Sequence, residues 1–232
     1  MKRVYRTVAV ATVQDGFSIT LDGRPVRTPG RAALVLPGRA LAEAVAAEWD
    51  AQQGKVNPAS MPIMQCAATA IDRVAPNHAE VAQLTARYGE TDLTCHRADH
   101  PQGLQDRQAA GWDPLLDWLA DSRAIRLLPV AGLFAVRQDQ DGLQRLEREL
   151  AGLDAFRLAG ISAATGCLGS VVLALALADG RLDADEAFRL SRIDEDWQAE
   201  RWGLDAEEAA RASRLAEEIR DLARFLSLLD GD

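Results

Sequence analysis

The chain has few cysteines and histidines and no long hydrophobic run. Its 232 residues include three cysteines, Cys66, Cys95 and Cys167, and no two of them form a CxxC pair. This spacing indicates neither a disulfide framework nor a zinc site, and it fits a reducing compartment. The longest apolar stretch, residues 167–178, is interrupted by a Gly-Ser pair and is shorter than the roughly 20 residues that cross a bilayer. We expect a buried helix there and no membrane insertion.

Motifs of common catalytic sites are also missing. No serine or cysteine lies in a GxSxG elbow or a Cys/His signature, so nothing local supports covalent catalysis. The glycine-rich segment 160–170 resembles a phosphate loop, but no Lys follows its second glycine. Its small residues Gly160, Ala163, Ala164 and Gly169 are better explained as sites where buried helices approach closely. We predict no catalytic or cofactor-binding residues.

One cluster of potential metal ligands precedes Pro101. Cys95, His96, Asp99 and His100 are side-chain types that bind transition metals. The two histidines could share a helix face, but the proline follows at once and the Glu of an HExxH motif is absent. We therefore interpret the segment as a loop beside a sheet and predict no metal. A small-molecule or metal-dependent enzyme that uses the segment from Cys95 to His100 is the alternative function.

Charge disfavours two classes of partner. Lys and Arg number 26 against 35 Asp and Glu, which gives a net charge of -9. Such a protein repels phosphate backbones and anionic lipid headgroups, so no nucleic-acid partner is expected. With 48% hydrophobic residues, the chain can bury a core in one large domain or two smaller ones.

The patterns predict an α+β fold with an N-terminal β-rich domain that also contains helices and a C-terminal all-α domain. Strands are expected at residues 4–13, 17–21, 25–28 and 33–36, with a hairpin turn at Asp22-Gly23. Helices are expected at residues 41–54, 62–74, 77–88 and 104–121. The β-like run 125–128 is expected to return to the first sheet.

After Gly142 the pattern is helical, with breaks near Gly152, Gly166 or Gly169, Gly180 and Gly203. No long linker occurs, so we place a tight boundary between domains 1–137 and 138–232.

Residues 183–202 are expected to form a helix with an acidic face. Asp196 and Glu200 lie one turn apart with the same charge, a mildly destabilising arrangement that Arg192 only partly offsets. The surplus negative charge either faces solvent or serves a cationic partner. Trp202 ends this segment, where an aromatic side chain serves equally well in a core or at an interface.

Six short motifs give the chain a family likeness. They are Gly23–Pro29, Glu48–Gln52, Trp112–Pro114, Leu153–Arg157, Leu173–Gly180 and Ser191–Gly203. In this order and separation, and over nearly its whole length, the chain resembles the assembly chaperones of the ATP synthase catalytic head that bind the α subunit.

The resemblance implies a molecular chaperone rather than an enzyme. Such a protein binds the unassembled α subunit of F-type ATP synthase and prevents its aggregation before it joins the β subunit. It needs no cofactor, and we expect a monomer when free. Mitochondrial members carry a long N-terminal extension that this chain lacks, which implies the bacterial cytoplasm, with the mitochondrial matrix as the location of organellar relatives.

The resemblance also implies which residues act. Glu195, Arg192, Trp197, Glu200 and Trp202 fall in the C-terminal motif and are the predicted partner-binding residues. Trp49, in the Glu-Trp-Asp motif, is predicted to be structural, so its replacement should chiefly impair folding.

Overall fold

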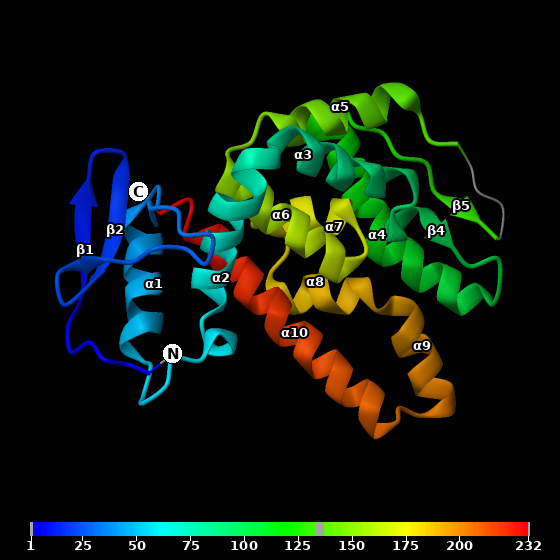
Figure 1. The fold of residues 1–232 in the computed structure, drawn as a ribbon. Helices are drawn as coiled ribbons and strands as arrows, with labels where there is room; N and C mark the ends of the chain where they lie inside the picture. The colour runs from blue at the N-terminus through cyan, green and yellow to red at the C-terminus, as the bar shows by residue number, and fades with distance from the viewer. Residues whose placement is uncertain (1, 133–136, 232) are drawn as a thin grey trace. The chain divides into compact units, whose positions relative to one another are not determined.

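The computed structural model describes residues 2–132 and 137–231 (Figure 1). They form two compact units. The first unit comprises the described residues of 1–78, 154–160 and 224–232, and the second comprises those of 79–153 and 161–223. The sequence places its boundary after residue 137 instead, and that division into domains stays a prediction.

The secondary structure is mixed α and β, which confirms the predicted fold class. The α-helices are α1 (Arg39–Asp50), α2 (Pro62–Thr69), α3 (His78–Ala86), α4 (Gln102–Arg123), α5 (Gln140–Ala151), α6 (Ala155–Leu168), α7 (Val171–Ala178), α8 (Ala184–Ser191), α9 (Ile193–Trp202) and α10 (Ala206–Ser227). Short helical turns are η1 (Pro58–Ser60), η2 (Ala70–Val74), η3 (Ala75–Asn77), η4 (Arg87–Glu90) and η5 (Leu93–Cys95). The strands are β1 (Val8–Val13), β2 (Gly16–Leu21), β3 (Arg24–Pro25), β4 (His96–Arg97) and β5 (Val130–Ala131).

The first unit is built on an antiparallel sheet in the order β1-β2-β3. The predicted turn between β2 and β3 is confirmed, because Asp22 and Gly23 both have positive φ, 49° and 78°, as a two-residue hairpin turn requires. The prediction of a strand at residues 33–36 is wrong. This segment forms only isolated bridges, Phe17 with Leu36 and Arg27 with Ala33.

Helix α1 contacts β1 and β2. Leu41 and Val45 on α1 are fully buried together with Ile19 of β2 and Ile63 of α2, and they form the centre of this unit's hydrophobic core. At the end of α1, Glu48 accepts hydrogen bonds from the backbone N–H groups of Ile63 and Met64, each 2.8 Å long. The carboxylate thereby satisfies donors that the first turn of α2 leaves free, and it fixes α2 to α1.

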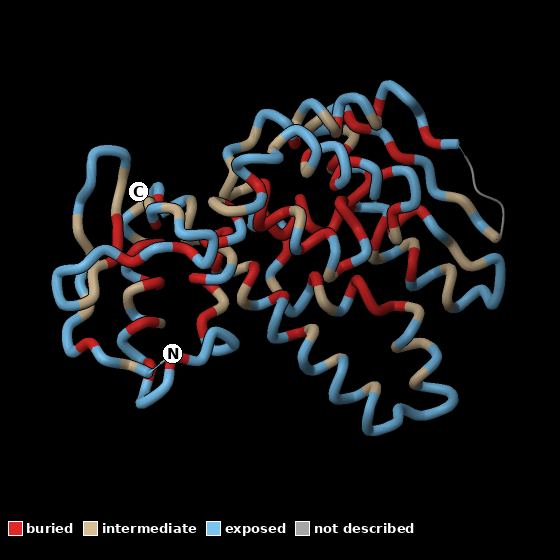
Figure 2. The backbone as a smooth tube through the Cα atoms, in the orientation of Figure 1, coloured by how far each residue is buried: buried red, intermediate tan, exposed pale blue. Residues whose placement is uncertain are grey.

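Helix α7 forms the centre of the second unit. Its eight residues are all buried, and Figure 2 shows further buried segments, coloured red, gathered around it. Helices α4 and α8 contact it. Because no face of α7 is exposed to solvent, none needs polar side chains, and its sequence is continuously apolar. The predicted buried helix is confirmed, although it begins only after Gly169, where φ is +65°. Among the described residues, no helix is long and apolar enough to cross a membrane.

A buried carboxylate fixes the start of α7. Asp92 is completely buried, and its oxygens accept hydrogen bonds from the Ser170 hydroxyl at 2.6 Å and the Val171 N–H at 2.7 Å. The Thr94 hydroxyl and N–H also donate to it, at 2.8 and 3.0 Å. The pKa of Asp92 lies above its ordinary value because the carboxyl is buried. The hydrogen bonds oppose this rise but do not cancel it. The side chain therefore joins η5 to the N-terminus of α7 through several hydrogen bonds in a fully buried site.

The prediction that residues 125–128 return to the first sheet is wrong. The strand in this part of the chain is β5, which pairs in parallel with β4 as a separate two-stranded sheet in the second unit. Residues 125–128 alternate buried and exposed side chains as a strand would, but they form no ladder. Instead, the Gln138 side-chain amide accepts from the Leu128 N–H at 2.8 Å and donates to the Leu128 carbonyl at 3.0 Å. The Gln138 side chain thus forms the two hydrogen bonds with Leu128 that the backbone of a neighbouring strand would otherwise form.

The predicted helix over residues 183–202 is two helices. Arg192 lies between α8 and α9 with φ −123°, outside the helical region. Asp183 is the N-cap of α8 and accepts from the Glu186 N–H at 2.7 Å, as expected for an acidic residue at a helix start. The predicted breaks at Gly152, Gly169, Gly180 and Gly203 are confirmed.

Candidate functional site

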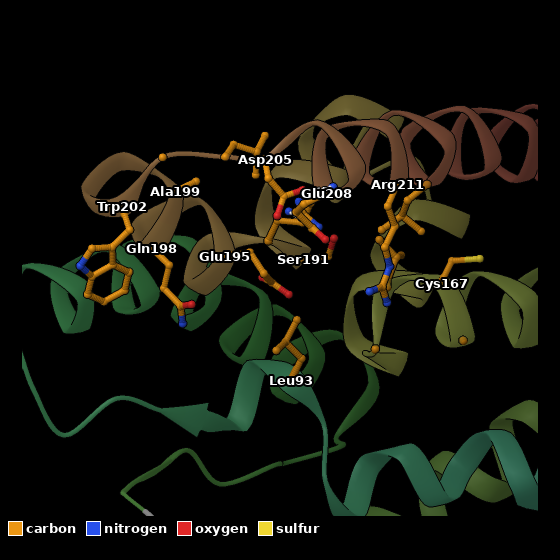
Figure 3. Close-up of a pocket in the computed structure, with 17 residues that line it drawn as sticks. Leu93, Cys167, Ser191, Glu195, Gln198, Ala199, Trp202, Asp205, Glu208 and Arg211 are labelled. Atoms are coloured by element: carbon orange, nitrogen blue, oxygen red, sulfur yellow. Dashed lines mark hydrogen bonds and ion pairs between the residues drawn. The ribbon is translucent and has the colours of Figure 1, made fainter.

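A pocket of about 570 Å³ opens in the second unit (Figure 3). Helix α9, the first half of α10 and the junction between α6 and α7 form its walls. Three of the five predicted partner-binding residues, Arg192, Glu195 and Trp202, line it. The structure therefore brings these three together at one cavity.

Arg192 joins the walls of the pocket. Its side chain is only 8% exposed, and Nη2 lies 2.9 Å from Oε1 of Glu208 on α10. Nε lies 3.7 Å from Oδ1 of Asp196 on α9. Because this side chain is almost completely buried, loss of the Glu208 carboxylate would leave the guanidinium with only the more distant carboxylate of Asp196. Arg192 is thus built to fix α10 against the α8–α9 junction.

The turn between α9 and α10 exposes apolar side chains. Gly203 has φ +82°, which lets the chain reverse after α9, and Asp205 accepts from the Glu208 N–H at 2.8 Å to begin α10. Trp202, at the end of α9, is 77% exposed, and Leu204, in the turn itself, is 50% exposed. Both also line the pocket. Large apolar side chains that stay exposed together are typical of interaction surfaces.

Glu195 provides a free carboxylate at the pocket. In Figure 3 it extends from α9 toward Leu93 on the opposite wall. The residue is exposed, and it forms no hydrogen bond or ion pair with any described residue. Its charge is therefore available to a group that enters the pocket.

The other two predicted partner-binding residues lie on the side of α9 that contacts α4. Arg107 of α4 binds Glu200 with two parallel hydrogen bonds, each 2.7 Å long. These bonds hold the pKa of Glu200 below and that of Arg107 above their ordinary values. The Trp197 ring lies 4.8 Å from the Arg107 guanidinium carbon and fits against Gly103, where a Cβ would come within 2.8 Å of the ring. Trp197 and Glu200 therefore hold α9 on α4 in this structure.

The candidate metal segment does not form a compact ligand set. Among residues 2–132 and 137–231, no three His, Cys, Asp or Glu side chains are grouped as a metal site requires. Burial, and secondarily the charge of Asp92, raises the pKa of Cys95 to about 12, so the thiolate that a metal binds is costly to form. His100 instead lies 2.5 Å from Asp99, from Nδ1 to Oδ1.

The glycine-rich segment 160–170 is mostly helical, because α6 continues to Leu168. A Cβ on Gly160 would lie 2.6 Å from a Leu226 methyl carbon, too close for any side chain. This confirms the interpretation of Gly160 as a site of close helix packing.

Trp49 lies in the core of the first unit and is 9% exposed. The Tyr5 hydroxyl donates to its carbonyl at 2.6 Å, and the two rings meet edge to face with centroids 5.9 Å apart. Its motif neighbour Gln52, also buried, donates to the Ser60 hydroxyl at 3.1 Å and accepts from the Asn57 N–H at 2.8 Å. These contacts support the predicted structural role of Trp49.

Sequence reasoning missed the α10 side of the pocket. Asp205, Glu208 and Arg211 all line it. A detectable signal existed, because an acidic residue followed three positions later by Glu marks a helix start, as in Asp205 and Glu208. That signal would have placed the start of α10, but not its position beside α9.

Known proteins resemble this chain in sequence and in fold. A family model described as ATP12 chaperone protein matches residues 2–120. The mitochondrial protein atp12 of Schizosaccharomyces pombe is 24% identical over 214 residues, which cover 87% of this chain and 74% of that protein. The crystal structure of Atp12 from Paracoccus denitrificans is 43% identical with a TM-score of 0.94, and the match covers 98% of this chain and 97% of that one. A point mutant of the same bacterial protein gives a TM-score of 0.95 at the same identity and coverage. The chain therefore belongs to the ATP12 chaperone family of ATP synthase assembly chaperones, as its ordered motifs predicted.

Proposed function

We propose that this ATP synthase assembly chaperone binds the unassembled α subunit of the F-type enzyme and prevents its aggregation before the β subunit joins it. The observation that carries the proposal is the pocket beside α9 and α10, where the unpaired Glu195 lies near the exposed Trp202 and Leu204. Apolar side chains of this kind can cover the exposed apolar surface of an unassembled client, and a free carboxylate can bind a cationic side chain.

The site suits a client that must later leave. Glu195 is exposed, and ion pairs with exposed partners contribute only about 0–1 kcal/mol. Trp202 supplies apolar area from the exposed end of α9 rather than from a deep cavity. Binding built from such contacts is moderate, so the β subunit can displace the chaperone.

The five predicted residues divide into two roles under this proposal. Glu195 and Trp202 contact the client directly. Arg192, Trp197 and Glu200 position them, because their own contacts fix α9 between α10 and α4. Trp49 acts on folding alone. We further propose that the free chain is a monomer and acts in the bacterial cytoplasm, whereas the Schizosaccharomyces pombe relative is named as a mitochondrial protein.

Co-expression with the α subunit tests the proposal. We expect the wild-type chain to raise the soluble fraction of the α subunit and to co-purify with it. Glu195→Lys should weaken co-purification, because a like charge then meets the client's cation. Glu217→Lys makes the same charge change on α10 outside the pocket and should behave as wild type. Absence of a complex with the wild-type chain, together with unchanged solubility of the α subunit, would refute the proposal.

A further inference from the structure

The pocket holds a free cation as well as a free carboxylate. Arg211 extends into it from α10, opposite the helix that carries Glu195 (Figure 3). Among the described residues, Arg211 forms no hydrogen bond or ion pair. The two unpaired charges of opposite sign therefore line one cavity.

The free state of Arg211 is unexpected from its helix position. Glu207 and Glu208 precede it by four and three residues, the spacings at which Glu and Arg pair along a helix. Neither pair forms in the structure, and Glu208 binds Arg192 instead. In a chain of net charge -9, a guanidinium without a carboxylate partner is available to an anion from outside.

We propose that the pocket binds a client segment that carries both a basic and an acidic side chain, with Arg211 binding the acidic one. This inference rests on the proposed function, and it adds a second charged contact to the one that Glu195 makes. A guanidinium binds a carboxylate through two parallel hydrogen bonds, which fixes orientation as well as position. The pair Glu195 and Arg211 would thus set the direction in which the segment lies between α9 and α10.

The arrangement also gives specificity. A client segment with two basic groups would place one of them against Arg211, and like charges across an interface are unfavourable. Trp202 and Leu204 at the mouth would cover the apolar residues beside the charged pair. The pocket therefore selects a charge pattern rather than positive charge in general.

Titration of the purified chain with the cognate α subunit tests this inference. Arg211→Glu should raise the Kd by about tenfold, because it replaces an attraction by a repulsion. Arg211→Gln only removes the charge and should raise the Kd by a smaller factor. Arg214→Glu is the matched control, since it makes the same charge change on exposed α10 outside the pocket, and it should leave the Kd within about twofold of wild type.

A variant in which the charges at positions 195 and 211 are exchanged distinguishes an effect of the charge pattern from an effect of the net charge. The double variant Glu195→Arg with Arg211→Glu keeps the net charge at -9, and we expect it to bind at least tenfold more weakly than wild type, because it reverses both charged contacts. Wild-type affinity in the double variant, or equal effects of Arg211→Glu and Arg214→Glu, would overturn the inference while leaving the proposed function intact. Failure of the wild-type chain to bind the α subunit would instead refute the proposed function. Circular dichroism confirms that each variant is folded.

Discussion

Single residues hold this fold together through contacts that no local pattern reveals. The clearest case is Asp92, whose carboxylate accepts from groups on residues 170 and 171, almost 80 positions further along the chain. From sequence it is one aspartate among many acidic residues, whereas the Asp22-Gly23 turn was predictable because its conformation depends only on its own residues. Local chemistry can thus be read from sequence, but a buried polar partner cannot.

Replacement of Asp92 by Ala should strongly destabilise the second unit. The variant leaves the buried N–H groups of Thr94 and Val171 without an acceptor, and we expect a loss of about 3 kcal/mol in the free energy of unfolding. Asp183→Ala removes only an exposed N-cap and should cost about 1 kcal/mol. Urea unfolding measures both, and equal losses would show that the Asp92 contacts contribute little.

Trp49→Ala should impair folding and spare binding. Removal of this buried ring leaves a cavity beside Tyr5, at an expected cost of about 3–5 kcal/mol. Thermal unfolding followed by circular dichroism gives the stability, and the Kd of the folded fraction for the α subunit gives the function. A variant with wild-type stability but lost binding would make Trp49 an interface residue.

At the scale of elements, α9 has two contact faces. Glu200 and Trp197 face α4, and Glu195 faces the pocket. The sequence predicted a continuous helix through this region because the backbone at Arg192 departs from helical geometry without any Gly or Pro to signal it. Sequence patterns located the acidic segment, but only the structure separates the side chains that hold α9 from those that are free.

The attachment of α9 to α4 should weaken in acid. Arg107 holds the pKa of Glu200 below its ordinary value of 4.5, so the pair stabilises the folded state fully above pH 4.5. That stabilisation is lost as the pH falls from 4.5 through the lowered pKa, because the carboxyl then binds a proton. Hydrogen exchange within α9, compared between wild-type and Glu200→Gln proteins, measures the effect. The two proteins should differ at pH 6 and converge at low pH, and a constant difference would contradict this explanation.

At the scale of the whole molecule, the candidate site combines segments that are distant in sequence. Leu93, Cys167, Glu195 and Arg211 all line one pocket, although nothing in their local sequences relates them. The family resemblance pointed to the C-terminal motif, three of whose predicted partner-binding residues line this pocket, and the folded chain adds α10 to them. Packing between helices decides this juxtaposition, which is why composition and periodicity could not predict it.

The central claim is that this chain binds the unassembled α subunit. The most direct measurement mixes the purified chain with separately purified α and β subunits of the F-type enzyme and follows complex formation by size-exclusion chromatography with light scattering. We predict a complex of one chain with one α subunit, none with the β subunit, and release of the chain when β is added to the complex. Binding to β in place of α, or no complex with either subunit, would contradict the claim.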